Sequence, residues 1–381
     1  MEIDLQTTEI DTVVVGAGPA GLATGACLQR VGVPFAILDR ADSVASSWRS
    51  HYARLHLHTA KRHSSLPYRP FPKEAPQYPS REQVVAYLDA YREAFDLPVH
   101  TGEAVTSVRR EADAWTTGST TGAWRSRNLV VATGYNRVPV RPTWPGESEF
   151  RGRVLHSSSY RDGEPFRGQN VLVVGVGNTG GEIAVDLCEH GARPGISVRN
   201  PLWIMPRDLM GRPVQESAIA LSRLPLPVRD AVGRTVSRVV FGDVARLGFR
   251  KPAEGPMTQI VKRGRIPLID VGTLALIRAG KVTVEPEIER FAAAGVRFTS
   301  GEEKPYDAIV LATGFTSGLE AFLEDRATAL DERGYPIASA STLLPGLYFV
   351  GFRNVPTGLL REIGFEARAA AAAIARSYVL R

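Results

Sequence analysis

The chain has 381 residues, of which 44% are hydrophobic and 23% charged, and its formal net charge is +6. This composition predicts a soluble globular protein, and the length favours two domains over one. The positive charge favours anionic cofactors or acidic substrates, or else it reflects only scattered surface arginines. No compact basic run with interleaved aromatic residues indicates a nucleic-acid partner.

The first predicted unit opens with an apolar run, Thr12–Val15, which leads into a turn with three glycines. A helix-like stretch follows, and the next predicted strand ends at Asp39. Glycines let the backbone approach a pyrophosphate, and free N–H groups at the helix start attract the anion. A carboxylate at the tip of the second strand accepts hydrogen bonds from ribose hydroxyls. We therefore expect FAD here, held by Gly16, Gly18, Pro19, Ala20, Gly21, Asp39 and Arg40.

The segment after this unit predicts a loop, a helix and three strands. The Pro-rich stretch Leu66–Pro79 is too punctuated for regular structure. A helix is expected over Ser80–Phe95, because Ser80 and Gln83 have capping-box spacing. Strands are expected over Val99–Val108, Ala114–Thr117 and Arg127–Ala132, the last ending in Ala132-Thr133-Gly134.

A second glycine turn follows the apolar run Val171–Val174, and its next strand, Ile196–Val198, ends at Arg199. A guanidinium at that tip suits a 2′-phosphate, so this unit predicts NADPH. Arg207 is a second candidate for the 2′-phosphate or the nicotinamide side, or else a surface arginine. The residues expected to bind NADPH are Gly175, Gly177, Asn178, Thr179, Gly180, Arg199 and Arg207.

The order of these units predicts an α/β protein with two Rossmann-like dinucleotide-binding domains, the second inserted in the first. The strand Ala308–Leu311 runs into Ala312-Thr313-Gly314, a near-copy of the earlier Ala-Thr-Gly. We expect the chain to cross between domains at both copies, with Thr133, Gly134, Thr313 and Gly314 close to both cofactors. The expected FAD-binding domain comprises residues 1–160 and 301–381, and the expected NADPH-binding domain residues 161–300. A C-terminal strand, Leu347–Val350, and an Ala-rich helix should complete the first domain.

Cys27 and Cys188 each fall in the helix after a glycine turn and are expected to be buried small hydrophobes. They form no Cys-x-x-Cys pair, so dithiol chemistry is disfavoured. The region Ala218–Leu247 predicts a helical cap over the site, or else an interfacial amphipathic element. No signal peptide and no membrane span are expected, and the protein is predicted to be cytoplasmic, with homo-oligomerisation left open.

The segment Phe150-Arg-Gly152-Arg-Val-Leu-His156-Ser-Ser-Ser-Tyr160 resembles the FxGxxxHxxx(Y/F) fingerprint of flavin-containing monooxygenases. The wider match resembles the YUCCA branch of that family over nearly the whole chain. It includes Gly16–Leu28, Arg54–Pro72, Phe166–Leu187, Met205–Arg207 and Pro267–Gly280. The resemblance implies FAD, NADPH, O2 and a C4a-(hydro)peroxyflavin, with oxidative decarboxylation of an aryl-pyruvate such as indole-3-pyruvate. The alternatives are N- or S-oxygenation of a small soft nucleophile, oxidation of a ketone, and a non-catalytic flavin-binding redox sensor.

The resemblance also implies flavin-side residues. His58 stands next to Thr59, at the position where the wider family has an Asn. It is the tentative catalytic residue, because it would influence the flavin peroxide. The alternative is a histidine that only packs in a cluster with His51, His56 and His63. That cluster has no zinc-like spacing, so no metal is expected. Further positions expected near the flavin nucleotide are Trp48, Val105 and Gly351.

Overall fold

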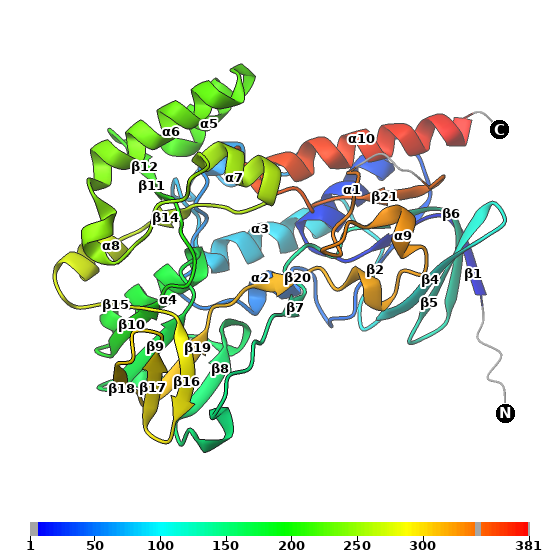
Figure 1. The fold of residues 1–381 in the computed structure, drawn as a ribbon. Helices are drawn as coiled ribbons and strands as arrows, with labels where there is room; N and C mark the ends of the chain where they lie inside the picture. Colours follow the sequence, from blue (N-terminus) through cyan, green and yellow to red (C-terminus); the bar gives the residue numbers. More distant parts are fainter. Residues whose placement is uncertain (1–6, 340–343, 380–381) are drawn as a thin grey trace.

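The computed structural model describes residues 7–339 and 344–379, so most of the acidic segment Met1–Glu9 lies outside the described residues. Figure 1 shows one sheet beside both termini, a second sheet at the lower left, and a group of helices above the second sheet. Among the described residues, no helix is both long and apolar enough to cross a membrane.

The first sheet has strand order β3-β2-β1-β6-β5-β4, and β21 pairs with β6. Alternate residues of its apolar strands face two cores. Val14 and Ile37 pack under the helices of residues 19–30, 81–94 and 359–379. Val13 and Leu129 pack against residues 319–330 on the other face. The strands are β1 (Thr7–Val15), β2 (Phe35–Leu38), β3 (Val99–His100), β4 (Val105–Glu111), β5 (Ala114–Ser119), β6 (Ala123–Val131) and β21 (Leu347–Phe349), and the helices are α1 (Pro19–Arg30), α2 (Ser46–Arg49), α3 (Arg81–Ala94), α9 (Arg326–Ala329) and α10 (Leu359–Val379).

Several local predictions are confirmed in the first half of the molecule, the part that contains the first sheet and its helices. The α3 helix begins with the expected capping box between Ser80 and Gln83. The C-terminal β21 returns to the first sheet, in parallel register with β6. The single strand expected over Val99–Val108 is wrong. It is divided into β3 and β4, because the chain turns at Gly102, which has a φ of +70°.

The second sheet is parallel throughout, with order β15-β10-β9-β19-β8. One face packs on α4, and the other packs on a three-stranded antiparallel sheet, β16-β17-β18. The elements are β8 (Arg153–His156), β9 (Asn170–Val174), α4 (Asn178–Glu189), β10 (Arg193–Ser197), β15 (Thr283–Glu285), β16 (Ile288–Ala292), β17 (Gly295–Phe298), β18 (Glu303–Pro305) and β19 (Ala308–Leu311). Since β8 and β19 both belong to this sheet, its hydrogen bonding extends beyond the boundaries expected at residues 160 and 301.

The two Ala-Thr-Gly segments lead the chain between the sheets. After Ala132-Thr133-Gly134 comes β7 (Val138–Pro139), and after Ala312-Thr313-Gly314 comes β20 (Phe315–Thr316). These two strands pair in antiparallel register, Phe315 opposite Pro139. The outgoing and returning chains therefore lie side by side between the two halves.

Residues 201–280 form a mainly helical layer over the second half, and the stretch Ala218–Leu247, expected to be a cap or an interfacial element, lies within it (Figure 1). Its base is a parallel pair, β11 and β14, and α6 packs against α7. The elements are β11 (Ile204–Pro206), β12 (Asp208–Leu209), β13 (Arg212–Pro213), α5 (Val214–Ala220), α6 (Leu226–Phe241), α7 (Pro256–Arg263), β14 (Leu268–Asp270) and α8 (Thr273–Arg278).

Candidate functional site: a cavity shared by two glycine turns

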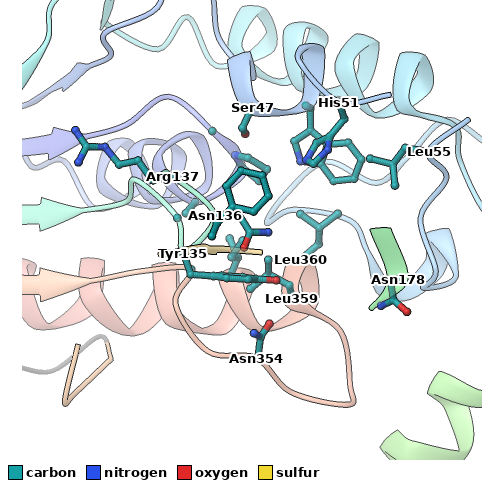
Figure 2. A pocket seen from close by; sticks show the side chains of 18 of the residues that line it. Ser47, His51, Leu55, Tyr135, Asn136, Arg137, Asn178, Asn354, Leu359 and Leu360 are labelled. Carbon is teal, nitrogen blue, oxygen red and sulfur yellow. The ribbon is translucent and has the colours of Figure 1, made fainter. Parts of the chain in front are cut away.

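A cavity of about 1190 Å³ lies where the two halves and the cap meet. In Figure 2, His51 and Leu55, Tyr135 and Asn136, and Leu359 and Leu360 surround the same space, and Asn178 of α4 lies at its edge. Most of the predicted site residues line it: Gly16, Gly18, Pro19, Ala20, Asp39, Arg40, Trp48, His58, Val105, Thr133, Gly134, Asn178, Thr179, Arg207 and Gly351. Seven do not line it: Gly21, Gly175, Gly177, Gly180, Arg199, Thr313 and Gly314.

The three glycines of the first turn have different physical roles. Gly16 has a φ of +108°, and a Cβ there would lie 2.7 Å from the Ala132 carbonyl oxygen. A Cβ on Gly21 would lie 1.8 Å from the Gly16 carbonyl oxygen, so this glycine allows the helix to pack on the turn. A Cβ on Gly18 would meet nothing within 4 Å. Gly18 therefore leaves open space on the cavity side, where a phosphate can approach the backbone.

The second turn repeats this arrangement at α4. A Cβ on Gly175 would lie 2.6 Å from the Ala312 carbonyl oxygen, and one on Gly180 would lie 2.0 Å from that of Gly175. Gly177, like Gly18, has open space where a Cβ would stand. Each turn thus packs beneath one Ala-Thr-Gly segment. Each also has one glycine with open space beside it, where a ligand can approach the backbone.

Asp39 is held with its carboxylate at the end of β2. One oxygen accepts a hydrogen bond from the Ala17 N–H at 2.6 Å, and the other accepts from the Ala41 N–H at 2.9 Å. A carboxylate has about four acceptor positions, so two such bonds leave capacity for ribose hydroxyls. Nearby, the Thr133 hydroxyl is buried and has no hydrogen-bond partner among the described residues. Both groups fit a nucleotide cofactor at this edge, because it would supply the missing polar contacts.

His58 joins the loop after α2 to the helix of the second turn. Its Nε2 lies 2.5 Å from Oε1 of Glu182, which is buried in α4. Burial, and after it the charge of Glu182, raises the pKa of Tyr52 well above its usual value. Burial lowers the pKa of the neighbouring His51. His58 therefore lines the cavity as part of an ordered polar group and is not an isolated packed ring.

Sequence reasoning missed Glu182. The available signal was the pair of acids Glu182 and Asp186, four residues apart on the buried face of an otherwise apolar helix. A carboxylate is almost never fully buried without a partner, so this pair predicts two partners from outside the helix. One of them is His58.

The partner of Asp186 comes from the Phe150–Tyr160 segment. The Tyr160 hydroxyl donates to Asp186 at 2.6 Å, and burial raises the pKa values of both groups. His156 Nδ1 accepts from the Ser158 N–H, which leaves Nε2 to donate to the Gly314 carbonyl at 3.1 Å. This segment thus fixes α4 and the second crossing relative to β8, and its Ser158 lines the cavity directly.

The two candidate arginines have different surroundings. The Arg199 side chain is 66% exposed, and its Nε lies 3.9 Å from Glu287. Arg207 lies over the Tyr78 ring at 4.2 Å and pairs with Asp208 at 3.2 Å. The desolvated Tyr78 hydroxyl also bonds Asp208, and its pKa is raised to about 12. Arg207 is therefore a fixed cation in the cavity wall, whereas Arg199 is free to meet a ligand from solvent.

The remaining flavin-side predictions, Trp48, Val105 and Gly351, all line the cavity. Trp48 packs against the first core with its ring 6.2 Å from that of His51. Val105 is the first residue of β4. At Gly351 the φ is +88°, and its N–H donates to the buried Glu366 at 2.8 Å.

The inserted half is tied to the first half by a residue that the sequence did not single out. Gln215, buried in α5, accepts from the Ala60 N–H at 2.9 Å and donates to the Thr357 carbonyl at 2.6 Å. Asn354, in the same C-terminal segment as Thr357, lines the cavity together with Tyr135, whose pKa burial raises to about 12. The cap and the C-terminal segment therefore close the cavity together.

The two glycine turns lie at the carboxyl ends of parallel strands, and Gly16 and Gly18 of the first turn line the same cavity as Asn178 and Thr179, which follow the second. This arrangement is typical of an oxidoreductase that brings two nucleotides together. Residues 13–210 match the family described as pyridine nucleotide-disulphide oxidoreductase. Two curated relatives from Oryza sativa subsp. japonica are the indole-3-pyruvate monooxygenases YUCCA1, at 41% identity, and YUCCA4, at 40%. Each alignment covers 89% of this chain, with 86% of the first relative and 82% of the second.

A solved flavin-containing monooxygenase from Stenotrophomonas maltophilia shares the fold, with a TM-score of 0.75, 24% identity, and coverage of 98% of this chain and 99% of that one. The chain belongs to the YUCCA family of flavin-dependent monooxygenases. It is an enzyme that uses a flavin and a nicotinamide cofactor and acts on a small molecule.

Proposed function

We propose that this chain is an NADPH-dependent FAD monooxygenase that converts an aryl-pyruvate, such as indole-3-pyruvate, to the corresponding acetate by oxidative decarboxylation. The observation that carries the proposal is that Gly18 of the first turn and Asn178 of the second line one cavity with the apolar cap residues Met257 and Ile260. The names of the rice relatives support the substrate class.

FAD is proposed for the first half, residues 1–160 and 301–381. The open face of Gly18 suits the pyrophosphate, and Asp39 suits the ribose. The cavity continues past Asp39 to Glu103 and Val105, which gives room for an adenine beyond the ribose. Trp48, His58, Thr133 and Gly351 would lie along the rest of the nucleotide.

NADPH is proposed for residues 161–300. The open face of Gly177 and the exposed start of α4 suit its pyrophosphate. Arg199 supports the preference for the 2′-phosphate, because within residues 7–339 and 344–379 its exposed guanidinium pairs with one distant carboxylate, Glu287, which a dianionic phosphate would replace. Arg250 donates to the backbone oxygen of Arg199, which holds this strand end in place.

The chain's own groups would orient the substrate and exclude water. The bound flavin, once reduced, supplies the chemistry by which O2 gives an oxygen atom to the substrate. Met257, Ile260 and Pro267 offer an apolar wall for an aromatic ring and limit water access. Glu182 holds the ring of His58 in one orientation at the cavity surface, where its Nδ1 can accept a hydrogen bond from a bound group.

Product analysis tests this proposal. The holoenzyme is incubated with NADPH, O2 and one of indole-3-pyruvate, phenylpyruvate, a thioether or a tertiary amine, and products are identified by mass spectrometry. The proposal predicts CO2 and the acid shortened by one carbon from both keto acids. An N- or S-oxide as the sole product would contradict it. Oxidation of NADPH without oxygenation of any compound in the panel would also contradict it.

A further inference from the structure

The buried face of helix α6 is mainly polar or small and its exposed face carries valines, which is the reverse of the pattern in an ordinary surface helix. Its buried positions are Asp230, Gly233, Ser237 and, at the C-terminal end, Phe241, so all but the last are polar or small. Asp230 accepts hydrogen bonds from the N–H groups of Met257 and Thr258 at the start of α7, and a Cβ on Gly233 would lie 2.6 Å from the ring of Pro256. The contact with α7 therefore uses capping and close approach, and apolar side chains contribute little to it.

Three valines of α6 face outward instead. Val228, Val232 and Val239 have exposed fractions of 45%, 36% and 77%. Their spacings of four and seven residues place them on one side of the helix, opposite the buried positions. Ala231 and Thr235, also exposed, fill the gaps between them. We call Val228, Val232 and Val239 the valine ridge.

Basic residues accompany the ridge along its length. At 100° per residue, Arg229 lies on one flank, and Arg234 and Arg238 lie on the other. Residues 221–251 contain seven Arg or Lys and two Asp, of which Asp230 is buried in the contact with α7. The partner that covers the ridge must therefore be apolar at its centre and anionic at its sides.

We propose that the valine ridge docks the protein on a membrane surface containing anionic lipids, with α6 lying in the plane of the interface. A projecting ridge needs no complementary groove in a fluid lipid layer, and the guanidinium groups remain among the headgroups while the valines enter the acyl boundary. A second copy of the chain would instead place arginine rows against each other, which opposes self-association. Because α6 packs on α7, whose Met257 and Ile260 line the cavity, docking places the cap one helix away from the lipid.

Vesicle co-sedimentation of the full-length holoenzyme tests this proposal, using phosphatidylcholine vesicles with and without phosphatidylserine. We expect binding only with phosphatidylserine. The variant R229Q/R234Q/R238Q should bind about fivefold more weakly per arginine removed. The variant V228Q/V232Q/V239Q should lose binding, although glutamine is the better helix former and α6 should persist.

The control is Val31→Gln, which changes a valine that is 43% exposed at the end of α1, in the other half of the chain. It should bind vesicles like the wild type. Monooxygenase activity without vesicles should be the same in all four proteins, because none of these side chains lines the cavity. Equal binding to both vesicle types, no binding at all, or unchanged binding by the valine variant would overturn the proposal. So would a wild-type dimer that the valine variant converts to monomer.

Discussion

Gly18 and Gly21 of the first turn predict opposite consequences for the same substitution. Gly21→Ala would place a Cβ 1.8 Å from the Gly16 carbonyl oxygen, and this oxygen belongs to the backbone and cannot rotate away. Since contacts of a Cβ below about 3 Å essentially do not occur, the turn and α1 must separate by about 1 Å. We expect a loss of about 4 kcal/mol or more in the free energy of unfolding.

Gly18→Ala should leave the fold intact, because its Cβ meets nothing within 4 Å and its φ of −80° suits any residue. The unfolding free energy should change by about 1 kcal/mol or less. The methyl group would instead occupy the space proposed for the pyrophosphate. Loss of one charge-assisted hydrogen bond, about 1.5–3 kcal/mol, weakens FAD binding by about 10- to 150-fold.

The assay is urea unfolding of the flavin-free proteins, together with FAD titration followed by flavin fluorescence. Gly177→Ala and Gly180→Ala repeat the comparison at the second turn, with NADPH as the ligand. The reasoning is refuted if Gly18→Ala binds FAD as tightly as the wild type. It is also refuted if Gly21→Ala unfolds at the wild-type urea concentration.

Three further changes test single contacts. Arg199→Ala should raise the Kd for NADPH about 10- to 150-fold and leave that for NADH nearly unchanged, and equal losses for both would show that Arg199 does not contact the phosphate. Tyr160→Phe removes the donor to the buried Asp186 and should cost about 1–3 kcal/mol in chemical unfolding, whereas an unchanged midpoint would contradict a buried hydrogen bond. Burial lowers the pKa of His156 below 6.5, so the unfolded chain takes up this proton first and wild-type stability falls as pH drops through 6.5 toward the folded-state pKa. His156→Gln retains an N–H donor for Gly314 but cannot titrate, so its unfolding free energy should depend less on pH between about 7.5 and about 5.5, and identical slopes would exclude this contribution.

Local signals predicted the parts of the fold that local chemistry determines. The glycine turns, the capping box at Ser80 and the return of the C-terminal strand each follow from a short run of residues. The pairing of β8 with β19 does not, because it joins residues about 150 positions apart. Nothing in the four-residue sequence of β8 indicates which strand it pairs with. The outward valines of α6 also differ from what hydrophobic periodicity predicts, since Asp230 and Gly233 make the inward contact.

The candidate site was predictable to the same extent. Asp39 and Gly18 follow from the requirements of a nucleotide, and both line the cavity, whereas Gly177, the open glycine of the second turn, does not. Glu182 and Gln215 were not predicted, because each acts through a partner from a distant segment, His58 in one case and Ala60 and Thr357 in the other. Such contacts depend on how the two halves meet, which no single stretch of sequence encodes.

Anaerobic reduction of the bound flavin tests most directly whether both nucleotides meet in this one cavity. The purified holoenzyme is mixed with one equivalent of NADPH or of NADH in a stopped-flow instrument, and the flavin absorbance is recorded. The shared cavity and the role of Arg199 predict complete bleaching by NADPH and much slower bleaching by NADH. No bleaching by NADPH, or equal rates with both nucleotides, would contradict them.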